Sequence, residues 1–195
     1  MTLTLRPHQT KAVKAMLRNT KGQIIIPTGG GKTMCMIDDA MNEFSRTVLS
    51  KTIVVVAPRI LLANQLSAEF LYHNLDGAAE SNATVNVMHV HSGETHHFST
   101  TNVDEIRQFN YDTACDQKHL LIFTTYHSLH KIQESNIVVD TIYFDEAHNS
   151  VQKNFFPATE HFSHFAERCY YFTATPKHSR SPVKAGMNWP EYGQV

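Results

Sequence analysis

Short apolar runs alternate along the chain with longer segments in which apolar and polar residues are mixed. Runs of this length and composition are typical of parallel strands that are buried on both faces of a sheet. We therefore predict strands over residues 23–27, 52–57, 84–90, 119–124, 138–145 and 168–173. The mixed segments predict helices over residues 7–18, 32–44, 60–72, 103–109, 128–133 and 155–166. This alternation predicts a doubly wound α/β fold with a mainly parallel sheet and helices on both faces.

Two segments depart from the alternation. Residues 76–118 are the most polar and irregular part apart from the strand at 84–90, and we expect a surface excursion from the sheet. Residues 177–195 carry two prolines and two glycines without an apolar period, and we expect a linker that leaves the domain. The 195-residue length then fits one domain over residues 1–176.

Composition narrows the class of protein. With 42% hydrophobic and 18% charged residues, the chain is globular and not collagen-like, low-complexity or disordered. A net charge of -1 means that any contact with nucleic acid depends on local clusters of charge. The three cysteines form no CxxC pair, which favours buried free thiols in a reducing compartment. We find neither a signal peptide nor a membrane segment, and we expect a soluble cytoplasmic protein.

A glycine-rich loop over residues 27–33 follows the first predicted strand and precedes a helix. Its glycines allow backbone N–H groups to turn toward one anion at the positive end of the helix. Lys32 would reach the outer phosphates and Thr33 would ligate Mg²⁺, although Ile26 stands where the strict motif has glycine. The alternative, a plain glycine-rich turn followed by a helix cap, would not require a strand directly before the loop and a helix directly after it. The candidates for binding the phosphates are Thr28, Gly29, Gly30, Gly31, Lys32 and Thr33.

An acidic pair ends the strand at 138–145. Asp145 would hold Mg²⁺, and Glu146 would orient and deprotonate the water that attacks the γ-phosphate. An isolated Asp-Glu pair is more often a strand-ending acidic turn. The phosphate loop upstream makes ATP hydrolysis the better interpretation.

Six short motifs in order resemble the first RecA-like domain of superfamily 2 helicases and translocases of the DEAD/DEAH type. They lie at residues 5–9, 27–33, 56–65, 124–129, 145–148 and 173–176. The resemblance implies that Gln9 reads the adenine edge, and that ATP and Mg²⁺ are the cofactors. It further implies contacts to the nucleic-acid backbone by Arg59, Thr124 and Thr125, and a coupling of hydrolysis to movement through His148, Thr173 and Thr175.

Variants within these motifs resemble a DNA-directed branch of the superfamily. The LRPHQ opening, the VHSG stretch at 90–93 and the TTYHSL run at 124–129 are similar to UvsW-like phage helicases, excision-repair helicases and restriction-enzyme motors. Single-stranded or branched DNA is therefore the expected partner, with RNA as the alternative. The resemblance also implies a second RecA-like domain that supplies arginine fingers, without which hydrolysis nearly stalls.

Other interpretations remain open from the residues alone. Arg59 could equally cap a local carboxylate, and Thr124 and Thr125 could simply end a strand. The chain could be a nucleic-acid-binding module that is switched by nucleotide without turnover. A small-molecule kinase would need an acceptor site and a lid, and we see neither. The four histidines His89, His91, His96 and His97 suggest a metal site, but solvent-facing loop histidines are the favoured interpretation because no Cys or HExxH partner accompanies them.

Overall fold

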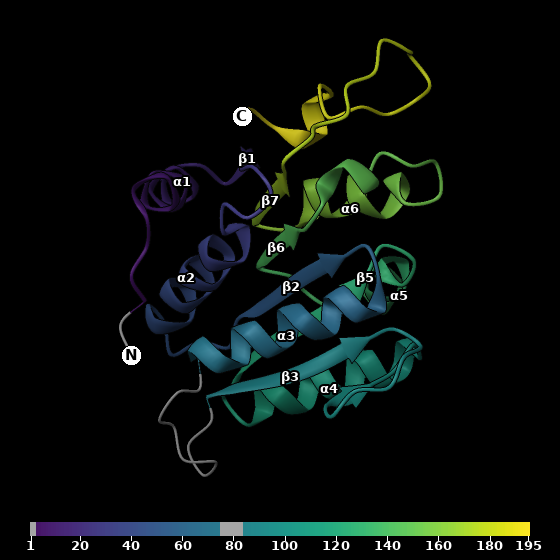
Figure 1. Cartoon of the computed structure of the whole chain (residues 1–195). Coiled ribbons are helices and arrows are strands. Elements are labelled where there is room, and N and C mark those ends of the chain that lie inside the picture. Colours follow the sequence, from purple (N-terminus) through teal and green to yellow (C-terminus); the bar gives the residue numbers. More distant parts are fainter. Residues whose placement is uncertain (1–2, 75–83) are drawn as a thin grey trace.

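The computed structural model describes residues 3–74 and 84–195 of the chain. Its strands form one seven-stranded sheet in the order β1-β7-β6-β2-β5-β3-β4, and every pairing is parallel (Figure 1). The predicted doubly wound α/β fold is confirmed.

The elements lie close to the predicted ones. The strands are β1 (Lys21–Ile25), β2 (Thr52–Ala57), β3 (Val85–Val90), β4 (Phe98–Ser99), β5 (His119–Thr125), β6 (Thr141–Phe144) and β7 (Arg168–Thr173). The helices are α1 (Pro7–Arg18), α2 (Lys32–Ser45), α3 (Ile60–Asn74), α4 (Val103–Cys115), α5 (Leu129–Ser135) and α6 (Phe156–Phe165). Two short 3₁₀ turns, η2 (Ala147–Asn149) and η3 (Pro190–Tyr192), follow β6 and β7 in the chain. In the described part of the chain, no helix combines the length and apolarity needed to cross a membrane.

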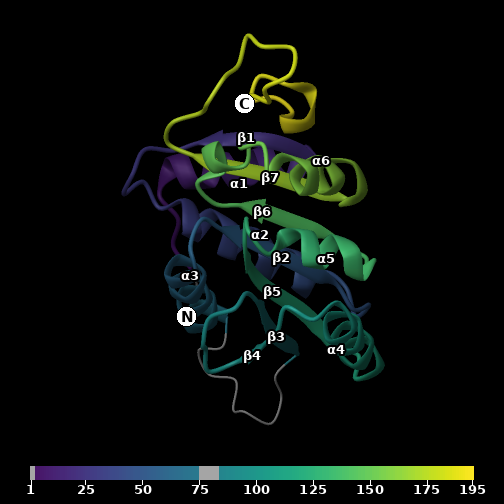
Figure 2. The same cartoon turned by 90° about the vertical axis from the view of Figure 1, so that its right-hand side faces the viewer.

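Helices cover both faces of the sheet, which explains the continuous apolar runs. Helices α1, α2 and α3 lie on one face, and α4, α5 and α6 lie on the other (Figure 2). Successive strand residues alternate between the two cores, so that Val54 packs on the side of α4 to α6 and Val55 packs on the side of α1 to α3. Both strands β2 and β5 are buried throughout.

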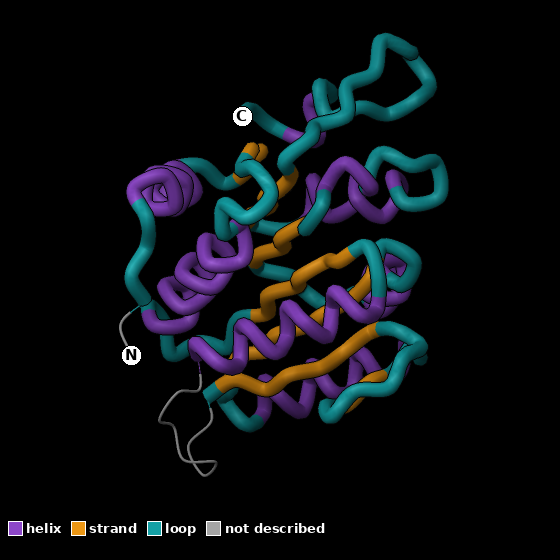
Figure 3. The backbone as a smooth tube through the Cα atoms, viewed as in Figure 1, coloured by secondary structure: helices purple, strands orange, loops and turns teal. Residues whose placement is uncertain are grey.

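The sheet order sorts the loops at its carboxyl edge into two groups. Strands β1, β7 and β6 are neighbours and carry the loops after residues 25, 173 and 144. Strands β2, β5 and β3 are neighbours on the other side and carry the loops after residues 57, 125 and 90. Figure 3 shows these loops at the ends of the strands. In open α/β sheets, ligands bind along this edge.

The segment at 76–118 is more regular than expected. It includes the short strand β4, and α4 runs six residues beyond the predicted end, to Cys115. Polar residues on α4 are held by the sheet instead of by solvent: Asn110 donates to Thr52 Oγ1 at 3.2 Å, and Asn86 donates to Thr113 Oγ1 at 3.1 Å. The part of the predicted excursion at 76–83 lies outside the described residues. Cys35 and Cys169 are buried free thiols as expected, whereas Cys115 is exposed.

The end of the chain packs back onto the body. Met187 and Tyr192 are fully buried beside α6 and β7, and Gln23 of β1 donates its side-chain amide to the carbonyls of Met187 and Gly193. The backbone N–H of Gln23 also donates to the carbonyl of Gln194 at 2.7 Å, at the outer edge of β1. Residues 187–194 therefore continue the domain, and the predicted linker toward a second domain stays a prediction.

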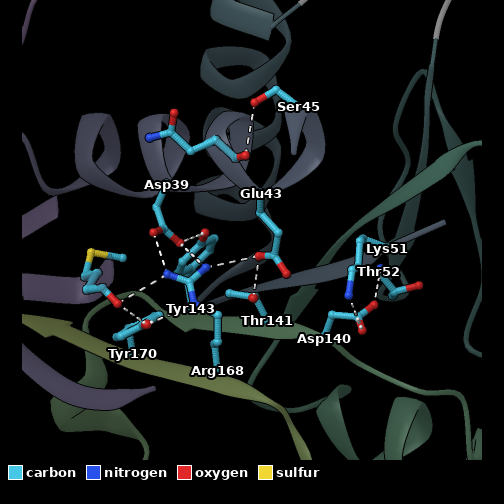
Figure 4. A network of polar contacts seen from close by, with 12 residues as sticks. Asp39, Glu43, Ser45, Lys51, Thr52, Asp140, Thr141, Tyr143, Arg168 and Tyr170 are labelled. Carbon is cyan, nitrogen blue, oxygen red and sulfur yellow. Dashed lines mark hydrogen bonds and ion pairs between the residues drawn. The ribbon is translucent and has the colours of Figure 1, made fainter. Parts of the chain in front are cut away.

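A buried polar network joins α2 to the amino ends of β6 and β7, opposite the edge that carries the motifs (Figure 4). Arg168 donates to both carboxylate oxygens of Asp39 at 2.7 and 2.9 Å and to Glu43 at 3.2 Å. Tyr143 and Thr141 donate to the same two carboxylates. Because the Asp39 side chain is 0% exposed, this ion pair anchors α2, the helix that follows the glycine-rich loop.

Candidate functional site

The glycine-rich loop makes a tight turn between β1 and α2. Gly29 and Gly31 adopt φ values of 80° and 81°, and the N–H of Gly30 donates to the carbonyl of Pro27 at 2.8 Å. Helix α2 begins at Lys32, with Gly31 as its N-cap. The loop thus delivers the chain to a helix N-terminus whose first N–H groups can bind an anion.

Two side chains of α1 hold this loop. Gln9 is 4% exposed and donates to the carbonyls of Gly30 and Gly31 at 3.3 and 3.2 Å, while its Oε1 accepts from the N–H of Arg6 at 2.7 Å. His8 Nε2 lies 2.7 Å from the carbonyl of Gly30. Both functional atoms of Gln9 are therefore engaged within the protein, and adenine recognition by Gln9, which would replace these bonds, stays a prediction.

The phosphate loop and the acidic motif meet in an ion pair. Lys32 Nζ donates to Glu146 Oε1 at 2.9 Å, with the two side chains 11% and 32% exposed. Glu146 adopts a left-handed conformation, with φ 47° and ψ 52°, which is uncommon for a residue other than glycine. Its carbonyl accepts from both the backbone N–H and the side-chain amide of Asn149. The turn η2 therefore fixes one side of this strained residue.

Asp145 lies beside Glu146 but is more deeply buried. Burial, reinforced by the charge of Glu146, raises the pKa of Asp145 to about 6, while Lys32 acts in the opposite direction. Two neighbouring carboxylates with one lysine leave an excess of negative charge in a desolvated place, where a divalent cation would stabilise the ionised form. Carboxylate and hydroxyl oxygens, such as those of Asp145 and Thr33, are the hard donors that Mg²⁺ prefers. These residues fit the predicted ion.

The predicted coupling residues also meet at this site. His148 Nδ1 lies 2.8 Å from Thr173 Oγ1 and 3.6 Å from Glu146 Oε2. Thr173 is fully buried and accepts from the N–H of Thr175, whose side chain is exposed. Burial lowers the pKa of His148, with Glu146 opposing the shift. Because β6 pairs with β7, the structure joins the acidic motif directly to the motif at 173–176.

The predicted nucleic-acid residues lie on the other half of the sheet, around a hollow at the ends of β2, β3 and β5. Arg59 is exposed just before α3, and Thr125 lines the same hollow. Thr124 is placed differently: it is fully buried and donates to the carbonyl of Val90 at 2.7 Å, so that it supports the strand end from inside. Three further polar residues line this hollow without having been predicted from the sequence: His127, Ser128 and Ser92. The only sequence signal for them is their place in the TTYHSL and VHSG runs.

The expectation that the histidines at 89–97 face solvent is wrong for two of them. His89 and His91 are buried, not solvent-facing. The N–H of Gly93 donates to His91 Nδ1 at 3.1 Å, which leaves His91 Nε2 to donate to His89 Nδ1 at 3.0 Å and His89 Nε2 to donate to Ser67 at 3.1 Å. Every ring nitrogen of this pair is occupied. Among the described residues no group of His, Cys, Asp or Glu is arranged to hold a metal ion.

Comparison with known proteins identifies the family of the chain and structures of similar fold. A family profile described as "Type III restriction enzyme, res subunit" matches residues 2–178. Among curated proteins, none matches the chain in sequence. The matching solved structures include a nuclease-deletion mutant of the Type ISP restriction-modification enzyme LlaGI in complex with a DNA substrate mimic, with 25% identity, a TM-score of 0.78 and coverage of 99% of this chain and 19% of that one.

Two other structures extend the comparison. The ATP-dependent Type ISP enzyme LlaBIII bound to DNA is 21% identical, with a TM-score of 0.75 over 100% of this chain and 15% of that chain. The UvsW helicase from bacteriophage T4 is 15% identical, with a TM-score of 0.60 over 89% of this chain and 53% of that chain. The predicted RecA-like fold is confirmed. The chain spans less than a fifth of the length of the two restriction enzymes and about half the length of the phage helicase.

Proposed function

The chain belongs to the family of the type III restriction enzyme res subunit, and we propose that it couples ATP hydrolysis to movement along DNA or to its remodelling. As a member of this family it is the ATPase domain of a superfamily 2 helicase or translocase, as in restriction-enzyme motor subunits.

One observation carries the proposal. The glycine-rich loop and the acidic motif follow β1 and β6, and the hollow with Arg59 and Thr125 lies at the ends of β2 and β5. Strands β6 and β2 are neighbours, so that the two sites adjoin along one edge. A kinase for a small molecule would have no use for the second site, whereas a nucleic-acid motor needs both.

The residues of the first site divide the chemistry of hydrolysis. Backbone N–H groups of the loop and the N-terminus of α2 would bind the phosphates. Lys32 would break its ion pair with Glu146 and would then neutralise the charge of the outer phosphates. Thr33 and Asp145 would hold Mg²⁺, which offsets the charge of the phosphates when it is bound. Glu146, once released from Lys32, would accept a proton from the attacking water. His148 and Thr173 would then carry the change at Glu146 to the exposed Thr175.

The second site would bind the polymer weakly. Arg59 provides a guanidinium beside the N-terminus of α3, and Thr125, His127 and Ser128 provide polar groups beside it. So few charges predict binding that is salt-sensitive and independent of sequence. The two matched restriction enzymes are bound to DNA or to a DNA mimic, which supports DNA as the polymer, and a second RecA-like domain would supply the arginine finger.

Mg²⁺-dependent ATP binding and turnover, measured with single-stranded DNA, duplex DNA and RNA, tests the proposal. We expect the chain to bind ATP and to hydrolyse it slowly on its own. We also expect its affinity for DNA to differ between the nucleotide-bound and nucleotide-free states. Stimulation by RNA alone would replace DNA with RNA as the substrate. DNA binding that ignores nucleotide would favour a plain binding module.

The matched control is Lys32→Ala. Because this lysine is proposed to contact the outer phosphates, we expect its loss to weaken MgATP binding about 10- to 150-fold, in line with the strength of charge-assisted hydrogen bonds. Wild-type affinity in Lys32→Ala would refute the assignment of the nucleotide site.

A further inference from the structure

Tyr126 connects the two halves of the sheet edge. It follows β5, on the half that carries the proposed polymer site, yet its hydroxyl donates at 2.6 Å to the carbonyl of Asp145 after β6. Strand β2 lies between β5 and β6, so the side chain crosses a whole strand to make this bond. Tyr126 is 3% exposed, and the bond is therefore shielded from water.

The accepting carbonyl belongs to the peptide that joins Asp145 to Glu146. The orientation of this peptide plane sets the direction in which the backbone continues into Glu146. Glu146 has the left-handed φ of 47°. On its other side the same residue is held by Asn149. The N–H of Asp145 is fixed independently, by donation to the carbonyl of Val56 at 2.8 Å. Tyr126 thus adds a restraint on the strained turn from the side of β5.

The polymer side of Tyr126 is equally well connected. Its N–H donates to the carbonyl of Ala57 at the end of β2, and Arg59 follows two residues later. The ring of Tyr126 packs on the ring of Phe155, with 5.7 Å between the centroids. The ring of His127 packs edge-on against the ring of Phe155 at 4.7 Å. His127 is exposed and lines the hollow. A displacement of the loop at 125–128 would therefore also move the buried side chain of Tyr126.

We propose that Tyr126 is a positioning residue that orients Glu146 through the Asp145 carbonyl and so links polymer binding at the β5 end to the nucleotide site. This inference rests on the proposed function and deepens it. Glu146 is paired with Lys32, so a rotation of the peptide before Glu146 changes how firmly Lys32 is held. Polymer binding then alters nucleotide affinity without touching the nucleotide.

The test removes only the hydroxyl, in Tyr126→Phe. The matched control is Tyr171→Phe, because Tyr171 is also buried and its hydroxyl also donates to a backbone carbonyl, that of Glu191 at 3.2 Å in η3, which contributes to neither proposed site. A fluorescent ATP analogue with Mg²⁺ is titrated into each protein with and without saturating duplex DNA. The ratio of the two dissociation constants measures the coupling between the sites, and the urea midpoint reports folding.

In the wild type we expect a coupling of about fivefold, which is the lower end of allosteric linkage. Tyr126→Phe should reduce this ratio to about one, and Tyr171→Phe should keep the wild-type ratio. Wild-type coupling in Tyr126→Phe, or an equal loss of coupling in Tyr171→Phe, would overturn the inference. A wild-type chain that binds no nucleotide would instead refute the proposed function and the coupling inference together.

A second variant keeps the test decisive if Tyr126→Phe does not fold. Phe155→Leu removes the ring that packs against both Tyr126 and His127 but leaves the hydroxyl bond in place. We expect a partial loss of coupling. An unchanged ratio in Phe155→Leu would show that the path through Tyr126 carries no coupling.

Discussion

Lys32 Nζ lies 2.9 Å from Glu146 Oε1, so that the group proposed to bind phosphate and the group proposed to activate water neutralise each other. The pair joins the loop after β1 to the turn after β6, across the intervening strand β7. Each partner must leave the other before it can act. This relationship makes the two roles testable with one variant.

Glu146→Gln removes the competing charge while it keeps the size of the side chain. We expect MgATP to bind more tightly, by up to about fivefold, because a partly exposed ion pair contributes about 1 kcal/mol or less. Equilibrium titration with a nucleotide analogue measures the change. Weaker binding than in the wild type would contradict the competition. In the full-length protein, unchanged turnover by this variant would refute Glu146 as the base.

Gly31→Ala tests the packing of Gln9 against the phosphate loop. An added Cβ would lie 2.1 Å from Gln9 Nε2, at a φ of 81° that disfavours side chains. We expect the loop to shift and nucleotide affinity to fall about tenfold or more, by analogy with other strained substitutions at such positions. The matched variant is Gly29→Ala, which has the same positive φ but meets nothing within 4 Å. Equal losses in the two variants would show that the contact with Gln9 is unimportant.

Arg168→Ala tests the network at the opposite end of the sheet. It leaves Asp39 with a buried uncompensated charge, and we expect the free energy of unfolding to fall by about 3–5 kcal/mol. Lys131→Ala is the control, since the pair of Lys131 with Glu134 is exposed and should contribute about 0.5 kcal/mol or less. Urea unfolding measures both. A small effect of Arg168→Ala would mean that Asp39 is stabilised without the arginine.

The buried histidines predict a pH dependence of stability. Burial lowers the pKa of His89 to about 3, and burial also lowers the pKa values of His91 and His97, which face it. Free histidine titrates near 6.5, so below about that pH the unfolded chain binds more protons than the folded chain. Stability should therefore fall as the pH drops from about 6.5 toward 3, by up to about 1.4 kcal/mol per pH unit for each histidine that stays neutral.

His89→Gln, which can still donate to Ser67, should lessen this dependence. The control is His130→Gln, which makes the same replacement at an exposed position. Urea unfolding at several pH values gives the comparison. A profile for His89→Gln as steep as that of the wild type would assign the acid sensitivity to other groups.

The sequence by itself determined the local units of this protein. Each apolar run followed by a polar motif and a helix is a contiguous signal, so that the phosphate loop at 27–33 and the acidic turn at 145–148 could be placed from their neighbours in the chain. The same reasoning failed for α4 beyond residue 109, because Asn110 and Thr113 look solvent-exposed until Thr52 and Asn86 bond to them.

The tertiary structure alone decided which units meet. The order β1-β7-β6-β2-β5-β3-β4 follows from the packing of all strands and helices at once, and no local pattern encodes it. That order pairs Lys32 with Glu146 and brings His148 to Thr173, and it turns Thr124 inward. It also carries the hydroxyl of Tyr126 across β2 to Asp145. In the sequence Tyr126 is one more aromatic residue at the end of an apolar run. Such a pattern indicates that the residue is buried, but it does not indicate which group the buried hydroxyl bonds to, because that partner depends on the neighbours in three dimensions.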